Sequence, residues 1–297
     1  MISILIPVYN VTVFPLVQEL SNQLKKANVE GEILVYDDFS DDVFRKKNST
    51  LTHLSQVLYK EMDKNYGRTF IRQLLAKDAS FNKLLFIDGD STIIDKNFLR
   101  NYFEAIGEQD NVYVGGRLYQ PVEPAACNKR LHWKYGTERE SLKGRTTALH
   151  TNNFCIAKDV FLQLNFPKEM SGYGHEDTWM ELVLVEKQKT IEFIDNPVLH
   201  EGLEDTAVFL EKTKNALRNL LVLANIFGES LVRNKVALYN LFYWQHKLGL
   251  SEIVRGVLNK KINKIEKKLL SCNPSLLDFD LYRLFYLTAI AKEKQIK

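Results

Sequence analysis

The stretch Lys83–Asp90 reads KLLFIDGD, an apolar run that ends in two carboxylates separated by one glycine. The run is typical of a buried strand, and alternate strand residues point the same way, so Asp88 and Asp90 are expected on one side of its end. Gly89 allows a ligand to approach the backbone closely. Paired carboxylates repel each other unless a cation lies beside them, and hard oxygen ligands suit Mg²⁺ or Mn²⁺. A solvated turn is the alternative, since Asp-Gly is a common turn dipeptide.

Apolar runs and helical patterns alternate over the first part of the chain. Strands are expected at Ile2–Pro7, Glu32–Tyr36, Gln56–Tyr59 and Lys83–Ile87, with helices at Val13–Ala27 and Gly67–Ala79. This alternation predicts an α/β fold with a mostly parallel sheet and crossover helices. Ligands of such folds bind at the carboxyl ends of the strands, where Tyr9, Asn10, Asp37, Asp38, Asp88 and Asp90 stand.

The pattern changes after the strand expected at Val112–Val114. Pro121–Arg145 is polar, basic and aromatic, and is expected to be a long loop with one helix. Further strands are expected at His150–Ala157, Thr190–Ile194 and Pro197–His200, with a helix ending at Glu186. From Asp205 the chain reads as helices only. We therefore expect an α/β domain over residues 1–204 and a basic helical region over residues 205–297.

Charge is distributed unevenly along the chain. The net charge is +3, but residues 205–297 hold 16 Lys and Arg against 8 Asp and Glu, which leaves the preceding part acidic. Five lysines at 260, 261, 264, 267 and 268 interleave with Ile262, Ile265 and Leu269. Such a basic amphipathic stretch predicts contact with an anionic membrane surface, with a solvated helical appendage as the alternative. Nucleic acid is not expected as a partner, because the sheet-bearing part is acidic.

No apolar run approaches the ~18 residues of a membrane span. The N-terminus opens on a strand without a basic region, so no signal peptide is expected. The three cysteines, Cys127, Cys155 and Cys272, are far apart and match neither a disulfide framework nor a zinc pattern. These features favour a reducing cytoplasm, with the chain peripheral on the inner face of the membrane.

Four segments occur in an order and spacing that together resemble a known family: Ile4–Asn10 (ILIPVYN), Tyr36–Asp41 (YDDFSD), Phe86–Asp90 (FIDGD) and Gly172–Thr178 (GYGHEDT). Over residues 1–204 the chain resembles the family 2 glycosyltransferases of the GT-A fold, of the bacterial polysaccharide and glycolipid type. Asn65–Arg72 (NYGRTFIR) is similar to the family's Asn-x-Gly motif followed by an arginine. The resemblance implies a Rossmann-like sheet with flanking helices. It also implies inverting, metal-dependent transfer of a hexosyl or N-acetylhexosaminyl group from a UDP-sugar to a glycan or lipid-linked acceptor.

The resemblance also implies a donor site. Its nucleotide-binding residues would be Pro7, Tyr9, Asp38, Arg68, Arg72 and Asp88. Asp38 would accept the uracil N3–H beside a stacking Tyr9, and Asp88 would contact the ribose or a metal-bound water. Helix capping is the alternative for the Asp37–Asp38 pair, and a surface ion pair for either arginine. Asp90 and His200 would hold Mn²⁺ or Mg²⁺, a Lewis acid for the diphosphate leaving group, although a lone histidine is usually structural.

Asp177 is the implied catalytic base, since the acceptor hydroxyl must lose a proton as it attacks the anomeric carbon. Glu176, Asn152, Asn153 and Trp179 would bind sugar or acceptor. A charged first helical turn, a local turn and core packing are the alternatives for these residues. A nucleotidyltransferase is a second functional hypothesis, although it would need a glycine-rich phosphate loop after the first strand. A non-catalytic sugar-nucleotide-binding scaffold is a third.

Overall fold

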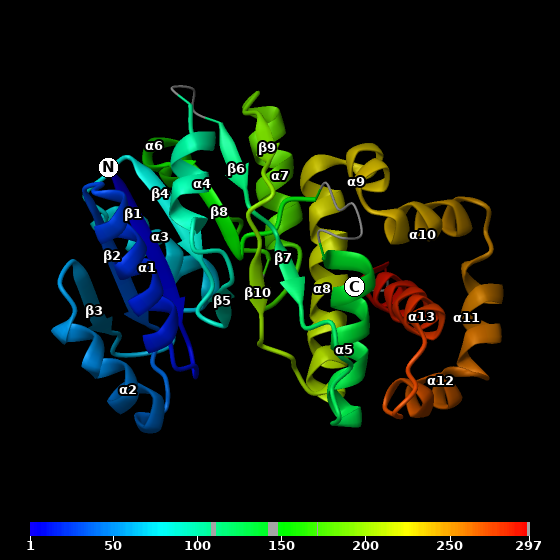
Figure 1. Ribbon diagram of the computed structural model, residues 1–297. Helices are drawn as coiled ribbons and strands as arrows, with labels where there is room; N and C mark the ends of the chain where they lie inside the picture. Colours follow the sequence, from blue (N-terminus) through cyan, green and yellow to red (C-terminus); the bar gives the residue numbers. More distant parts are fainter. Residues whose placement is uncertain (108–110, 142–147, 171, 296–297) are drawn as a thin grey trace. The chain divides into compact units, whose positions relative to one another are not determined.

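The computed structural model describes residues 1–107, 111–141, 148–170 and 172–295 (Figure 1). The chain divides into two compact units, each described by itself. The first comprises residues 1–120, 139–166 and 183–202, and the second comprises residues 121–138, 167–182 and 203–297. The second unit thus contains two segments that precede residue 205. Residues 142–145 of the expected loop Pro121–Arg145 lie outside the described residues.

A seven-stranded sheet with the order β3-β2-β1-β4-β8-β6-β9 forms the frame of the first unit (Figure 1). Its strands are β1 (Ile2–Val8), β2 (Gly31–Asp37), β3 (Val57–Glu61), β4 (Lys83–Ile87), β6 (Val112–Val114), β8 (Asn153–Ala157) and β9 (Ile191–Phe193). Neighbouring strands pair in parallel, except that β8 is antiparallel to both β4 and β6. The expected mixed α/β class with a mostly parallel sheet is confirmed.

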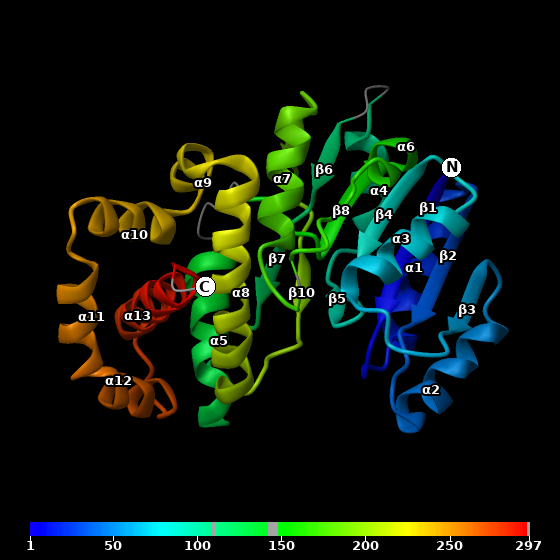
Figure 2. The ribbon, with the colours of Figure 1, turned by 180° about the vertical axis from the view of Figure 1, so that it is seen from behind.

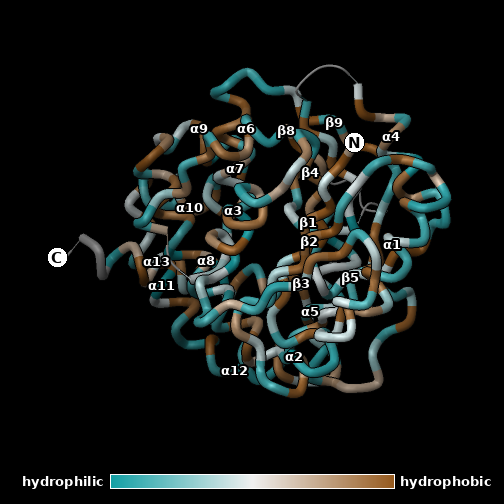
Figure 3. The backbone as a smooth tube through the Cα atoms, turned by 90° about the vertical axis from the view of Figure 1, so that its left-hand side faces the viewer, coloured by the Kyte–Doolittle hydropathy of each residue, from teal (hydrophilic) through white to brown (hydrophobic). Residues whose placement is uncertain are grey.

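Both faces of this sheet are covered. On one face, alternate β1 residues such as Ile4 and Ile6 pack with α1 (Phe14–Ala27) and α4 (Phe98–Ala105). On the other face, Phe86 of β4 stacks on Phe154 of β8, with ring centroids 4.9 Å apart. Double burial explains why the strands read as continuous apolar runs, visible as brown segments in Figure 3. The other helices wholly within this unit are α2 (Asp42–Asn48), α3 (Arg68–Asp78) and α6 (Lys158–Leu162).

The first unit also contains a three-stranded sheet that the sequence did not predict (Figure 2). It consists of β5 (Ser91–Ile93), β10 (Val198–His200) and β7 (Arg117–Tyr119), in the order β5-β10-β7. Its register places His200 opposite both Ser91 and Tyr119. This sheet therefore brings a histidine from late in the chain next to the Asp88–Asp90 motif.

The second unit is helical. Its helices are α5 (Arg130–Tyr135), α8 (Thr206–Phe227), α9 (Glu229–Lys235), α10 (Ala237–Lys247), α11 (Ser251–Asn259), α12 (Ile262–Leu269) and α13 (Leu276–Gln295), and α7 (Glu176–Glu186) begins in it. Helices α10, α11 and α12 surround α13 (Figure 1). Ile262, Ile265 and Leu269 of the basic stretch are buried in this unit's core, so the apolar face of α12 is occupied within the protein. No helix in the described ranges is long and apolar enough to cross a bilayer.

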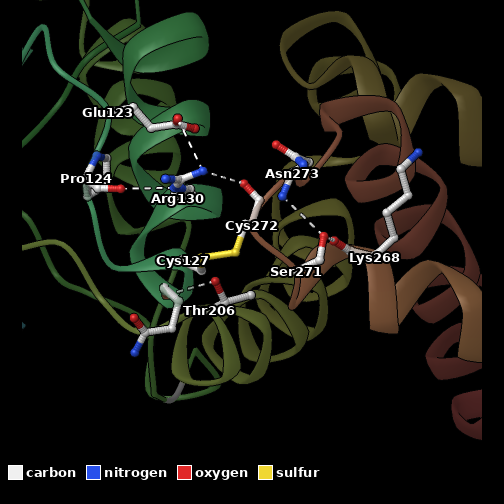
Figure 4. Close-up of a disulfide and its surroundings, with 10 residues drawn as sticks. Glu123, Pro124, Cys127, Arg130, Thr206, Lys268, Ser271, Cys272 and Asn273 are labelled. Atoms are coloured by element: carbon white, nitrogen blue, oxygen red, sulfur yellow. Dashed lines mark hydrogen bonds and ion pairs between the residues drawn. A yellow bond between two sulfur atoms is a disulfide. The ribbon is translucent and has the colours of Figure 1, made fainter.

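A disulfide joins Cys127 to Cys272 within the second unit, with an S–S distance of 2.01 Å (Figure 4). The expectation that the cysteines form no disulfide is therefore wrong. The partners are separated by 145 positions, and spacing alone gives no sign that the fold brings them together. Beside the bond, the Arg130 guanidinium donates to the carbonyl oxygens of Pro124 and Cys272, both at 3.0 Å. The argument for a reducing compartment loses its support.

Replacing both Cys127 and Cys272 with serine is expected to lower the free energy of unfolding by about 2–5 kcal/mol. The bond closes a long loop, so it reduces the number of conformations that the unfolded chain can adopt. Urea unfolding of the oxidised wild type and of the double variant measures the difference. Dithiothreitol should destabilise the wild type by the same amount and leave the variant unchanged. Equal stabilities of variant and oxidised wild type would contradict the role of the bond.

Candidate active site

The end of β2 is tied to the turn that precedes α3. Asp38 follows β2, and its N–H donates to the Val8 carbonyl oxygen at 2.8 Å, which sets it beside the end of β1. Its Oδ1 accepts the Tyr66 N–H at 2.7 Å, and its Oδ2 accepts the Gly67 N–H at 2.8 Å. Gly67 has φ +85°, a conformation that favours glycine. The Asn-x-Gly segment is thus held by Asp38, the carboxylate that was predicted to bind the uracil ring.

Asp37 and Asp38 have different surroundings. Asp37 is fully buried, and its Oδ1 accepts the Ser40 N–H at 2.7 Å, so it closes the turn after β2. Asp38 is also buried, but each of its oxygens accepts one backbone N–H and has a second lone pair. Tyr9, directly after β1, is 57 % exposed and presents its ring at the same sheet edge, whereas Pro7 lies partly buried within β1.

Two arginines of α3 converge on Asp88. The Arg68 guanidinium lies 2.6 Å from Asp88 Oδ2, and Arg72 pairs with Asp88 Oδ1. Arg72 is buried and also donates to the Thr151 carbonyl oxygen at 2.8 Å, whereas the Arg68 side chain is 35 % exposed. Two guanidinium groups thus surround one carboxylate at the end of β4, and planar guanidinium donors are well suited to hold an anionic ligand.

The neighbouring asparagines Asn152 and Asn153 differ sharply. Asn153 is fully buried: its Nδ2 donates to the Gly116 and Asn196 carbonyl oxygens at 3.0 and 2.9 Å, and its Oδ1 accepts the Tyr102 hydroxyl at 2.7 Å. The side-chain amide of Asn153 therefore makes its hydrogen bonds within the core of the first unit. The Asn152 side chain is 2 % exposed, and neither its oxygen nor its nitrogen has a hydrogen-bond partner among the described residues. Its backbone oxygen accepts the Asp88 N–H at 2.9 Å, which places Asn152 beside the acidic motif.

Asp90 and His200 approach each other as expected. Asp90 Oδ1 lies 3.4 Å from His200 Nδ1, and this oxygen is buried without an ordinary hydrogen-bond partner in the part of the chain that the structure describes. Burial raises the pKa of Asp90, but His200, Arg68 and Arg117 outweigh burial and bring the pKa below its usual range. The carboxylate is therefore ionised at neutral pH.

An oxygen and an imidazole nitrogen suit Mn²⁺ or Mg²⁺, which are often held by few protein ligands together with substrate phosphates and water. Within the described ranges, no group of three or more His, Cys, Asp and Glu side chains forms a site by itself. The Asp90–His200 pair fits a cation that takes its remaining ligands from a diphosphate.

Two features that the sequence analysis missed position this pair. The Tyr119 ring meets the His200 imidazole edge-on at 5.3 Å, and the Tyr119 hydroxyl donates to Glu140 at 2.5 Å. Gly202 lies against Asp90, so that a Cβ at Gly202 would overlap the Asp90 carboxylate. Neither Tyr119 nor Gly202 lies in a recognisable sequence motif. They reach Asp90 and His200 only because β5, β10 and β7 pair in the short sheet.

The Gly172–Thr178 segment opens α7 in the second unit. Glu176 accepts the Gly174 N–H at 2.9 Å, and Asp177 lies in the first helical turn. His175 adopts φ +66°, and its Nδ1 lies 3.1 Å from the Thr178 hydroxyl. Burial and the Arg283 cation lower the pKa of His175 to about 4, although Asp177 opposes this. His175 is therefore neutral near pH 7.

Trp179 is buried, which favours its packing role over stacking on a sugar.

The family model for glycosyl transferase family 2 matches residues 3–162, a region that contains the Asp38, Asn65–Arg72 and Asp88–Asp90 segments. The chain belongs to this family. The match covers more than half of the chain and ends before α7 and His200. In a comparison of sequences, no curated protein matches the chain.

Solved structures share the fold. The mannosyltransferase PcManGT from Pyrobaculum calidifontis, in complex with GDP-Man and Mn²⁺, aligns over 100 % of this chain and 87 % of its own, with 12 % identity and a TM-score of 0.55. TarS 1–349 from S. aureus aligns over 100 % and 92 %, with 16 % identity and a TM-score of 0.51. Glucosyl-3-phosphoglycerate synthase from Mycobacterium tuberculosis, with Mn²⁺, UDP and glucosyl-3-phosphoglycerate, aligns over 74 % and 78 %, with 13 % identity and a TM-score of 0.51.

In two other S. aureus TarS structures the alignment spans only 66 % and 39 % of the TarS chain. At these identities the similarity concerns the fold, which is the GT-A fold of family 2.

Proposed function

We propose that the chain is an inverting, metal-dependent glycosyltransferase that moves a sugar from a UDP-sugar to a hydroxyl of a glycan or lipid-linked acceptor. The observation that carries the proposal is the end of β4, where Asp88 meets two arginines and Asp90 meets His200. Guanidinium groups from α3 and an imidazole from β10 thus meet the two carboxylates of one short motif. Such a set suits a diphosphate with its counter-cation.

The donor would be held by residues from both motifs of the first unit. Asp38 keeps lone pairs for the uracil N3–H, with Tyr9 stacking and Pro7 shaping the base pocket. Arg68 contacts the diphosphate, while Arg72 holds Asp88 in place for the ribose. Bound Mn²⁺ or Mg²⁺, held by Asp90 and His200, would act as a Lewis acid for the departing UDP. The Asn152 amide has no hydrogen-bond partner among the described residues and would supply a donor and an acceptor for sugar hydroxyls, a role for which the Asn153 amide, bonded within the core, is less suited.

Asp177 is proposed as the base that takes the proton from the acceptor hydroxyl, with Glu176 binding acceptor hydroxyls. Direct attack on the face opposite UDP inverts the anomeric carbon. The acceptor class proposed is that of surface polysaccharide or glycolipid synthesis. Release of UDP, rather than pyrophosphate, distinguishes this reaction from nucleotidyl transfer, and any turnover excludes a scaffold role.

Calorimetric titration of UDP is the direct test. We expect micromolar binding in the presence of Mn²⁺ and its loss on addition of EDTA, because the diphosphate is held through the cation. Asp90→Asn should weaken this binding at least tenfold, on the order of the 1.4 kcal/mol that a lost charged contact contributes. Asp195→Asn, at an exposed position of the same unit, is the matched control and should bind as the wild type does. Absence of UDP binding with and without Mn²⁺ would refute the UDP-sugar proposal.

A further inference from the structure

Exposed apolar side chains gather where α10 meets α11 in the second unit. Leu248 and Leu250 flank the turn, at 65 % and 41 % exposure. Gly249 between them has φ +70°, which allows the sharp change of direction. The full set, called here the α10–α11 corner, is Leu241, Trp244, Leu248, Leu250, Ile253 and Val257, all of them exposed.

The spacing of these residues places them on continuous faces. Leu241, Trp244 and Leu248 follow the i, i+3, i+7 pattern along α10, and Ile253 and Val257 follow i, i+4 along α11. The opposite faces are anchored, since Phe242 of α10 and Leu258 of α11 are buried. Both helices pack on α13 (Figure 1). The corner is thus an apolar surface on a fixed support, and apolar surface of this kind marks an interaction site.

Basic side chains lie at the end of α10 and, past the corner, at the far end of α11 and on α12 (Figure 1). Lys247 ends α10, Lys260 and Lys261 follow α11, and Lys264 and Lys267 lie on α12, all of them exposed. The acid of α11, Glu252, is paired with Arg255 at 2.6 Å and with Lys292 at 2.8 Å. Because the apolar face of α12 is buried, its lysines can act only by their charge. Helices α10 to α12 therefore combine apolar side chains, a tryptophan and lysines that form no ion pair within the described part of the chain.

We propose that the α10–α11 corner inserts into the surface of a bilayer that contains anionic lipid, with the α12 lysines on the headgroups. Aliphatic side chains enter the acyl boundary, tryptophan favours the interface, and lysines gain from the negative surface potential. A second copy of the chain fits less well, because a twofold interface would gather the lysines of both copies around one apolar contact with no acidic residues of the corner to offset them. This proposal is independent of the reaction proposed for the first unit. The sequence predicted membrane contact through the basic stretch of α12, whereas we propose that the apolar contact is made by the preceding α10–α11 corner.

Vesicle co-sedimentation of the full chain tests the proposal. We expect binding to vesicles of phosphatidylcholine mixed with phosphatidylglycerol, and weak binding to phosphatidylcholine alone. Leu248→Ser with Leu250→Ser should lower the partition coefficient roughly tenfold, and Lys260→Glu with Lys261→Glu and Lys264→Glu should lower it by at least as much. Val208→Ser with Leu231→Ser, at exposed apolar positions of the same unit, should leave it unchanged.

Trp244 gives a second readout. Mixed vesicles should shift the tryptophan emission to shorter wavelength, and Trp244→Phe should remove that shift while Trp133 and Trp179 remain. Binding of the corner variants equal to the wild type would overturn the proposal. So would sedimentation velocity showing a wild-type dimer that the leucine variant dissociates, without vesicle binding in either protein. No donor or metal enters these assays, so their outcome is separate from that of the UDP titration.

Discussion

Replacing Asp177 with asparagine is expected to lower kcat by about 10²–10⁴-fold and to leave the Kd of the UDP-sugar unchanged. Asparagine keeps the shape of the side chain but cannot take the acceptor proton. UDP release under saturating donor and acceptor measures kcat, and calorimetry measures donor binding. The neutral state of His175, whose pKa is lowered to about 4, means that this histidine does not supply a compensating charge.

Glu176→Gln is the matched control for this prediction. Both substitutions remove one negative charge from the first turn of α7, so both cost a similar helix-dipole contribution of about 0.3–1 kcal/mol. A glutamine oxygen can still accept the Gly174 N–H, which Glu176 now accepts at 2.9 Å. We expect a modest rise in the KM for the acceptor and little change in kcat. Normal transfer by Asp177→Asn, or an equal loss in Glu176→Gln, would show that Asp177 is not the base.

The sheet of the first unit was predictable because its signals are local. Each buried strand is a short apolar run, and β1, β2 and β4 were located within a residue or two of their observed bounds. The polar residues that follow those strands lie at one sheet edge for the same topological reason. The proximity of Asp90 and His200 was predicted only by family resemblance, because nothing local connects positions 110 residues apart.

Other features could not be read from the sequence, because they depend on distant partners. Strands β5 and β7 have three residues each, too few for a periodic pattern. Asn152 and Asn153 are identical as letters, and only the hydrogen bonds of Asn153 to Gly116 and Asn196 show which of them serves the core. The disulfide joins cysteines whose separation carries no signal. The basic stretch at α12 resembled a free amphipathic helix, but its apolar face is taken up by the core.

Arg72→Met is expected to lower the free energy of unfolding by about 1–3 kcal/mol, because it leaves one Asp88 oxygen and the Thr151 carbonyl without their buried donor. Arg72 is almost fully enclosed and links Asp88 to the Thr151 backbone. Methionine fills similar space without the charge. Urea unfolding with ligand-free protein measures the loss.

Arg68→Met provides the comparison within the same helix. Arg68 pairs with the same carboxylate, yet its side chain is 35 % exposed, and such pairs contribute about 1 kcal/mol or less. We therefore expect a nearly wild-type unfolding curve together with weaker UDP binding, since this guanidinium is the one that a diphosphate can reach. Equal destabilisation by the two substitutions, or unchanged UDP affinity in Arg68→Met, would contradict this division. The expected result would show that one carboxylate is oriented by a buried arginine so that an exposed arginine beside it remains accessible to the ligand.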